Sequence, residues 1–298
     1  MGRRRRVKIA LACLAVIAIS SEIGLRLAGA GSYPLYDIDD EIKYIPSANQ
    51  HGTYFNRYAW HFNDRHMASS SNWSAEKHPN LVLVGNSIVL GGNRSKHDEK
   101  LGALLEKELA GRYIVWPVAA SGWSNINEMA YLDRNVDVLR NADAVIIEFM
   151  EGGLSLTGTW PGYDVFPDER PWLLTAHILR EIWLSHLAQE TFRDFGVLPE
   201  IGMPDKRELE RFKTLVTNIV KERKLVIFLY PTVTNLRNKS QWQRPIAPVV
   251  EICRVTAAKC VDIAQVPAWN ESAYFIDGVH QTAEGTKILA SILARAVN

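Results

Sequence analysis

Short apolar runs alternate with longer amphipathic stretches from Pro79 to the end of the chain. Each run has the length and the β-branched composition of a strand that is buried on both faces. The runs predicted to be strands are residues 81–85, 113–118, 143–149, 224–231 and 259–263. Apolar residues at helical spacing predict helices over residues 97–110, 124–139, 172–193, 205–221 and 282–296. This alternation predicts a mostly parallel five-stranded sheet with helices on both faces.

The first thirty residues have a different pattern. Arg3–Arg6 and Lys8 form a basic cluster, and Ile9–Ile19 form a short apolar core, as in a secretion signal. The apolar core is short for a membrane span, and Glu22 and Arg26 interrupt its extension toward residue 30. Small residues near positions 20 and 30 would also suit a signal peptidase. We favour an uncleaved inner-membrane anchor over a cleaved signal, with the basic end in the cytoplasm and the following residues in the periplasm or outside the cell.

The pattern divides the chain into three parts. Residues 1–30 are the signal or anchor segment, residues 31–78 are an irregular N-terminal extension, and residues 79–298 are the α/β domain. Within the extension, short strands are expected near Tyr44 and Thr53. Residues 151–223 form an insertion between the third and fourth strands of the domain.

Charge and composition exclude several classes of protein. The 298-residue chain is 47% hydrophobic and 22% charged, which is typical of a folded globular protein. Without the five basic residues at the N-terminus, 29 basic residues face 33 acidic ones, so we expect no nucleic-acid partner. No group of Cys and His has metal-ligand spacing, and no cofactor is predicted. Cys253 and Cys260 either pair in an oxidising compartment or remain two buried thiols.

The first predicted strand ends in Gly85-Asn86-Ser87. In an open parallel sheet ligands bind at the carboxyl ends of the strands, so the Ser87 hydroxyl is a candidate nucleophile. The alternative is that a serine here only caps the next helix. Near the C-terminus, Asp277 and His280 lie three residues apart on one loop. A serine needs an imidazole to take its proton and a carboxylate to orient that imidazole, and this loop could supply both.

This order of motifs resembles the SGNH/GDSL hydrolases, over roughly residues 78–298. The resemblance implies a flavodoxin-like three-layer α/β/α fold and makes Ser87 the nucleophile, His280 the base and Asp277 its orienting group. Gly122 falls where the family has its oxyanion glycine, so the N–H groups of Ser87 and Gly122 would stabilise the oxyanion.

The third block of the family departs from the pattern. Where the family has Gly-x-Asn-Asp, this chain has Met-Glu-Gly-Gly, so Gly152 replaces the oxyanion asparagine. Loss of one such donor can cost on the order of a hundredfold in rate. Asn86, Asn125 and Asn127 are the candidate replacements, and spacing does not choose between them. Alternatively, the reaction is slower or of another kind.

Two tryptophans are candidate substrate contacts. Trp160 lies in the insertion, and Trp123 follows the candidate oxyanion glycine. Either could stack on a sugar ring, although tryptophans also serve as ordinary packing.

The resemblance implies a serine-dependent acyl-ester enzyme whose partner is an O-acylated polysaccharide or an acyl donor. Water as the second acceptor gives an esterase, and a sugar hydroxyl gives an O-acyltransferase. The chain is similar to SGNH-type proteins that add or remove acetyl groups on bacterial envelope polysaccharides. The alternatives are a catalytically impaired carbohydrate-binding or assembly component, supported by Gly152, and a purely structural envelope protein.

Overall fold

A computed structural model describes residues 2–76, 79–92, 95–183 and 203–298. At its centre is a five-stranded sheet with the order β6-β5-β7-β8-β9, in which every neighbouring pair is parallel. The strands are β5 (Asn80–Gly85), β6 (Ile114–Ala119), β7 (Ala144–Phe149), β8 (Lys224–Leu229) and β9 (Lys259–Asp262). The chain enters the sheet at β5, next to one edge, forms that edge with β6 and then crosses through β7 and β8 to the opposite edge at β9. This is the flavodoxin-like order, and it confirms the predicted fold class.

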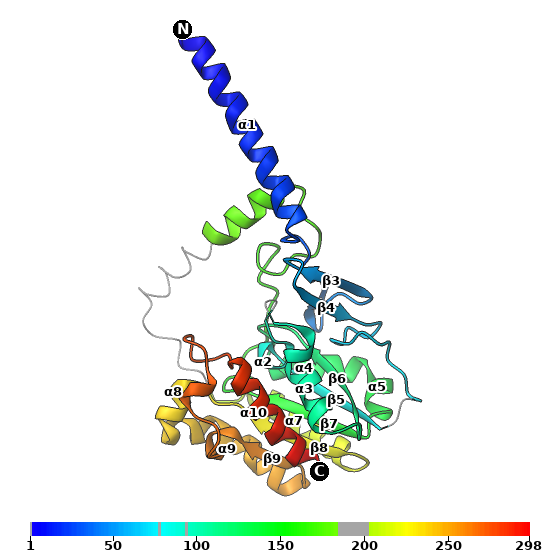
Figure 1. The fold of residues 1–298 in the computed structure, drawn as a ribbon. Coiled ribbons are helices and arrows are strands. Elements are labelled where there is room, and N and C mark those ends of the chain that lie inside the picture. The colour runs from blue at the N-terminus through cyan, green and yellow to red at the C-terminus, as the bar shows by residue number, and fades with distance from the viewer. Residues whose placement is uncertain (1, 77–78, 93–94, 184–202) are drawn as a thin grey trace.

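Helices cover both faces of the sheet (Figure 1). They are α2 (Ser87–Leu90), α3 (Leu101–Glu108), α4 (Asn125–Arg134), α5 (Val136–Arg140), α7 (Lys206–Val220), α8 (Val233–Arg237), α9 (Lys239–Thr256) and α10 (Ala283–Val297), with single turns η1 (His97–Glu99), η2 (Ile263–Gln265) and η3 (Glu271–Ala273). On β5, Val82 and Val84 pack with residues of α4, α7 and α9, whereas Leu81 and Leu83 pack with residues of α3 and α10. The alternation of side chains along a strand therefore produces two cores, one on each face.

Two predicted helices are interrupted. The helix expected over residues 97–110 is a single turn, η1, followed by α3, and Lys100 between them has extended backbone angles. The helix expected over residues 124–139 divides into α4 and α5 at Asn135, which ends the first and precedes the second. The periodic spacing therefore located these helices correctly but missed their breaks, which depend on single residues with non-helical backbone angles.

The N-terminal extension is more regular than predicted. Strands β1 (Tyr36–Asp39) and β2 (Lys43–Pro46) form one antiparallel hairpin, and β3 (Gln50–Tyr54) and β4 (Tyr58–Phe62) form another. The strands expected near Tyr44 and Thr53 are confirmed. Tyr44 is fully buried and Trp60 nearly so, which shows that the extension packs onto the domain instead of lying loosely over it.

Helix α1 (Arg3–Leu27) projects away from the folded body (Figure 1). Among the described residues it is the one helix long and apolar enough to cross a membrane, and none of its apolar window is buried in the protein. Next to its C-terminal end lies a part of the insertion, where residues 174–183 are helical. Residues 184–193 of the predicted 172–193 helix lie outside the described residues.

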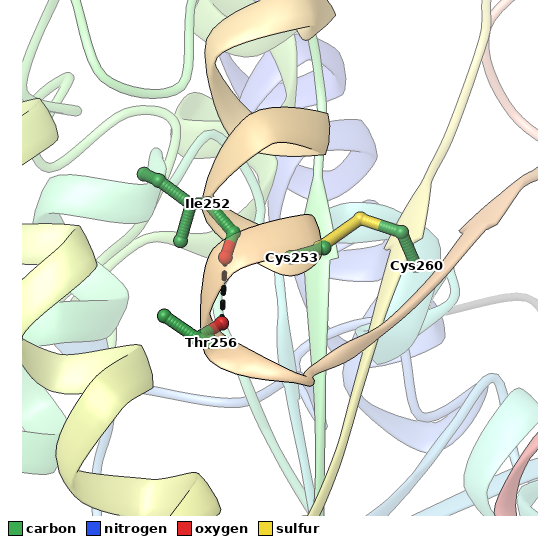
Figure 2. Close-up of a disulfide and its surroundings, with 4 residues drawn as sticks. All are labelled: Ile252, Cys253, Thr256 and Cys260. Atoms are coloured by element: carbon green, nitrogen blue, oxygen red, sulfur yellow. Dashed lines mark hydrogen bonds between the residues drawn. A yellow bond between two sulfur atoms is a disulfide. The ribbon is translucent and has the colours of Figure 1, made fainter.

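Cys253 near the end of α9 and Cys260 in β9 form a disulfide (Figure 2). Of the two alternatives that the sequence left open, the structure contains the pair. The disulfide links the last turns of a helix to the strand that follows it, and it supports the edge of the sheet at β9. Cys13 in α1 is the free cysteine.

We expect the chain unfolded without reductant to react with one equivalent of a thiol reagent, and with three after reduction. Replacing both paired cysteines by alanine should lower the free energy of unfolding by about 2.5 kcal/mol, because the loop of 7 residues would no longer be closed in the unfolded chain. Denaturant midpoints of the Cys253→Ala/Cys260→Ala variant and of a Cys13→Ser control would measure this. Three free thiols before reduction would show that the pair does not form.

Candidate active site

The turn that carries the candidate nucleophile Ser87, the Ser87 turn, begins where β5 leaves the sheet. The side chain of Asn86 accepts a hydrogen bond from the backbone N–H of Ile88 and so caps the short helix α2, which begins at Ser87. Asn86 thus takes the capping role that the sequence left open for the serine. The Ser87 hydroxyl is free to turn toward the loop of Asp277 and His280, which lies close to it in space although it is near the other end of the chain.

The structure brings Ser87, His280 and Asp277 into one hydrogen-bonded chain. His280 Nε2 lies 2.9 Å from Ser87 Oγ, and His280 Nδ1 lies 2.9 Å from Asp277 Oδ2. In this arrangement the imidazole can accept the serine proton while the carboxylate fixes its tautomer and its orientation. The side chains of His280 and Asp277 are 45% and 48% exposed, so the three groups lie at an open surface.

The loop that carries Asp277 and His280 is held from several sides. Asp277 Oδ1 accepts the backbone N–H groups of Val279 and His280. The side chain of Gln281 donates to the backbone oxygen of Ile88, which ties the loop directly to α2. Partial burial acts to raise the pKa of Asp277, but the two backbone N–H groups and the imidazole outweigh it and lower the pKa. Asp277 is therefore ionised at neutral pH, as an orienting carboxylate must be.

The two backbone N–H groups predicted to stabilise an oxyanion are those of Ser87 and Gly122. Among the described residues, neither the N–H of Ser87 nor that of Gly122 has a hydrogen-bond acceptor. Gly122 has a positive φ of 82°, and a Cβ there would lie 2.8 Å from the Tyr44 hydroxyl, which itself donates to Ser121 O. The position therefore requires glycine, and its N–H remains unused.

Asn125 and Asn127 do not replace the missing asparagine. The side-chain amide of Asn125 donates to Glu128 Oε2 and to the backbone oxygen of Glu148, so both of its hydrogens are used. The amide of Asn127 likewise donates to the backbone oxygens of Ile42 and Gly158. Both side chains are buried. The expectation that Asn125 donates to an oxyanion is wrong, because packing has committed its amide to structural bonds.

Asn86 is the candidate whose amide is least firmly bound. Its Nδ2 lies 3.2 Å from the sulfur of Met150, a weak acceptor, and its side chain also bonds to the carboxyl group of Glu148. Met150 follows β7 directly, in the segment where the resemblance places the missing asparagine.

A buried carboxyl group that the sequence analysis did not single out binds the backbone of the Ser87 turn. Glu148 is 1% exposed, and its Oε2 accepts the backbone N–H of Asn86 at 3.0 Å. A Cβ at Gly85 would lie 2.4 Å from the same oxygen, so Gly85 makes room for this carboxyl group. Burial raises the pKa of Glu148 to about 8. A glutamate within the apolar strand run 143–149 was the available signal.

A second buried carboxyl group, that of Glu128, lies near Glu148. Burial raises the pKa of Glu128 well above its usual value, and the charge of Glu148 raises it further. Asn125 lies between the two, bonded to the side chain of Glu128 and to the backbone of Glu148. Two carboxyl groups in one low-dielectric site cannot both ionise cheaply, so this pair holds protons at neutral pH.

The two candidate tryptophans differ in position. Trp123 is 4% exposed and its indole N–H donates to the backbone oxygen of Tyr44, so it is a core residue and the prediction of substrate contact is wrong. Trp160 is half-buried and donates to the backbone oxygen of Phe166 within the insertion. Its role in substrate contact stays a prediction.

No protein-family model matches this sequence, and no curated protein is detectably similar to it. The structure is similar to solved structures of SGNH hydrolases and acetylesterases. They include a proposed SGNH hydrolase from Slackia heliotrinireducens, with 15% identity, a TM-score of 0.44 and coverage of 74% of this chain and 99% of that one. A variant of Axe2, an acetyl-xylooligosaccharide esterase from Geobacillus Stearmophilus, has 17% identity, a TM-score of 0.46 and coverage of 74% and 94%.

A carbohydrate acetylesterase family member from Sinorhizobium meliloti has 14% identity, a TM-score of 0.44 and coverage of 73% of this chain and 97% of that one. At this level of identity and overlap, the likeness assigns neither an activity nor a substrate to this chain.

We expect the free energy of unfolding to fall as pH rises from about 4.5 to about 8, because folded Glu148 keeps a proton that the unfolded chain has lost. The Glu148→Gln variant keeps an acceptor for the Asn86 N–H and removes this titration. Its stability should therefore fall less steeply over that window, by up to about 1.4 kcal/mol per pH unit. Urea midpoints measured across the window would test this, with Glu108→Gln as an exposed control. Equal slopes in the wild type and the Glu148→Gln variant would contradict the assignment.

Proposed function

We propose that this chain is an SGNH-type serine enzyme that cleaves or transfers acyl groups held in ester bonds. The observation that carries the proposal is the continuous hydrogen-bonded chain from Ser87 Oγ through His280 to Asp277, with 2.9 Å at each of the two links. The backbone N–H groups of Ser87 and Gly122, which have no acceptor among the described residues, accompany it. A nucleophile, a base, an orienting carboxylate and oxyanion donors are the parts that acyl transfer needs.

In the proposed reaction, Ser87 Oγ attacks the ester carbonyl carbon while His280 Nε2 takes the hydroxyl proton. The carbonyl oxygen becomes an oxyanion that accepts hydrogen bonds from the N–H groups of Ser87 and Gly122. His280 then gives its proton to the leaving alcohol, and the acyl group remains on Ser87. A second hydroxyl compound, water or a sugar, repeats these steps in reverse and releases the acyl group.

Asn86 is proposed as the third oxyanion donor. Its cap to Ile88 uses the side-chain oxygen, which directs the amide nitrogen away from the helix and toward Met150. An amide hydrogen that now faces the weak acceptor Met150 would then turn to the oxyanion and strengthen a pair of backbone donors that lacks the asparagine replaced by Gly152.

An acetylated polysaccharide of the cell envelope is the proposed substrate. The chain begins with a basic cluster and an apolar helix, which supports export and anchoring in the inner membrane. The disulfide of Cys253 and Cys260 supports an oxidising compartment. Beside the triad, Phe275 and Ile276 are exposed, so a long polymer could lie across the site without entering a closed pocket.

The alternative is a binding or assembly component with an impaired site. Gly152, at a positive φ of 83°, brings no side-chain donor to the third block. A binding component would keep its affinity for the polysaccharide when Ser87 is replaced, and it would not react with a serine-directed probe.

We expect a fluorophosphonate probe to label the full-length chain at Ser87. Labelling should vanish in Ser87→Ala and fall on the order of a thousandfold in rate in His280→Ala and Asp277→Asn, because the hydroxyl then lacks an activated base. Rates of labelling and of acetyl-ester hydrolysis would be measured together, with Ser272→Ala as an exposed serine control. A folded wild-type protein that resists the probe would favour the binding component.

Replacing Asn86 by serine should separate its two roles. Serine keeps an oxygen that caps α2, but it lacks the amide nitrogen. We expect kcat to fall on the order of a hundredfold with little change in the thermal midpoint. Asn125→Ser serves as the matched control, because its loss should lower stability by breaking two buried hydrogen bonds. An unchanged kcat in Asn86→Ser would show that the two backbone donors suffice.

A further inference from the structure

Two charged residues near the end of α1 interrupt its apolar sequence and have partners in the insertion. The carboxylate of Glu22 accepts the backbone N–H groups of Leu174 and Thr175 at 3.0 and 2.8 Å, and the Thr175 hydroxyl at 2.9 Å. Glu22 Oε1 also pairs with Arg26 Nε, at 2.6 Å. Glu22 therefore caps the helix over residues 174–183 from outside that helix.

Arg26 fixes the same junction from the other side. Its guanidinium donates to the backbone oxygens of Pro171 and Trp172 at 3.2 and 3.0 Å. Leu174 is buried, and a Cβ at Gly31 would lie 3.2 Å from its side chain, so the segment packs closely against the chain that leaves α1. Residues 171–175 of the insertion are thus bound to the end of α1, and Figure 1 shows the two helices meeting where α1 leaves the body.

The opposite side of this segment is apolar and exposed. Trp172 is 96% exposed, Leu173 59%, Leu179 63% and Trp183 62%. Ala176, Leu179 and Trp183 follow helical spacing and are all exposed, whereas Leu174 and His177 on the other side are buried. Two tryptophans and two leucines beside one another on a short stretch need an apolar surrounding, and tryptophan is enriched where membranes meet water.

The length of the apolar stretch in α1 indicates how far residues 172–183 lie from the bilayer. The 13 uncharged residues 9–21 extend over about 20 Å as a helix, whereas the hydrocarbon core is about 30 Å thick. If α1 spans the membrane, Glu22 and Arg26 lie at its outer boundary, and their bonds to residues 171–175 hold the segment at the same depth. Glu22 and Arg26 can lie at the membrane boundary because they pair with each other and with backbone groups of residues 171–175.

We propose that residues 172–183 lie in the outer interface of the membrane, with Trp172, Leu173, Leu179 and Trp183 in contact with lipid. The inference rests on the proposed anchoring of the chain through α1. This contact would act as a second attachment beside the span and would fix the orientation of the domain relative to the membrane surface.

The test uses the full-length chain with Cys13 replaced by serine, so that a single introduced thiol can carry an environment-sensitive fluorophore. Trp172→Cys and Leu179→Cys are the two reporters, and both original side chains are largely exposed, so neither change should prevent folding. Val136→Cys, at an exposed apolar position of α5, is the matched control. Each protein is reconstituted into phosphatidylcholine and phosphatidylglycerol vesicles, with and without nitroxide lipid labelled near the headgroup, and flotation is measured.

We expect flotation of every variant and quenching at positions 172 and 179 at least about twofold stronger than at 136, because interfacial side chains lie within about 10 Å of the acyl boundary. Flotation with equal quenching at all three positions would overturn the interfacial contact and leave the anchor in place. Failure to float would overturn both the anchor and the contact. Reaction of Ser87 with the fluorophosphonate probe reports on the proposed chemistry independently of either result.

Discussion

The hydrogen bond between Ser87 and His280 joins two residues 193 positions apart in the chain, and the site depends on it. The bond forms because the strands are parallel, so that the turn after β5 and the loop after β9 emerge at the same edge of the sheet. The strand order places β5 inside the sheet, between β6 and β7, so the Ser87 turn has a neighbouring strand on each side. Gln281 strengthens the junction by donating to the backbone of Ile88 on the helix that carries the serine.

Beneath this junction, the protein tolerates two buried carboxyl groups that lower its stability at alkaline pH. Glu148 accepts the backbone N–H of Asn86 in the Ser87 turn. Glu128 accepts the side-chain amide of Asn125, which also donates to the backbone oxygen of Glu148. Burial of such groups without a cation is costly, and one oxygen of Glu148 has no partner within the described residues. A cost of this kind is typical of a region shaped for a site, where the geometry of the turn outweighs the best packing.

Charged residues that are unfavourable in their local sequence also form structural contacts in α1. Glu22 and Arg26 shorten the apolar stretch of α1, which weakens it as a membrane span when it is considered alone. In the structure both residues bind residues 171–175 of the insertion, so the two charges join the helix to the domain. Features that look like defects in a local pattern thus become contacts between distant segments.

The sequence by itself determined the parallel α/β fold and the five strands to within a few residues, and it singled out Ser87, His280 and Asp277, which the structure brings together. Apolar runs, helical spacing and the order of motifs are local properties, and they survive in any packing. The sequence did not determine which of three asparagines has the least firmly bound amide, that Trp123 is buried, or that Glu148 contacts the turn. Each of these depends on which atoms lie within about 3 Å after the chain has closed on itself. Asn125 and Asn86 have the same side chain, and only the carbonyl and carboxyl groups brought beside Asn125 from α4 and β7 decide that its hydrogens are already used.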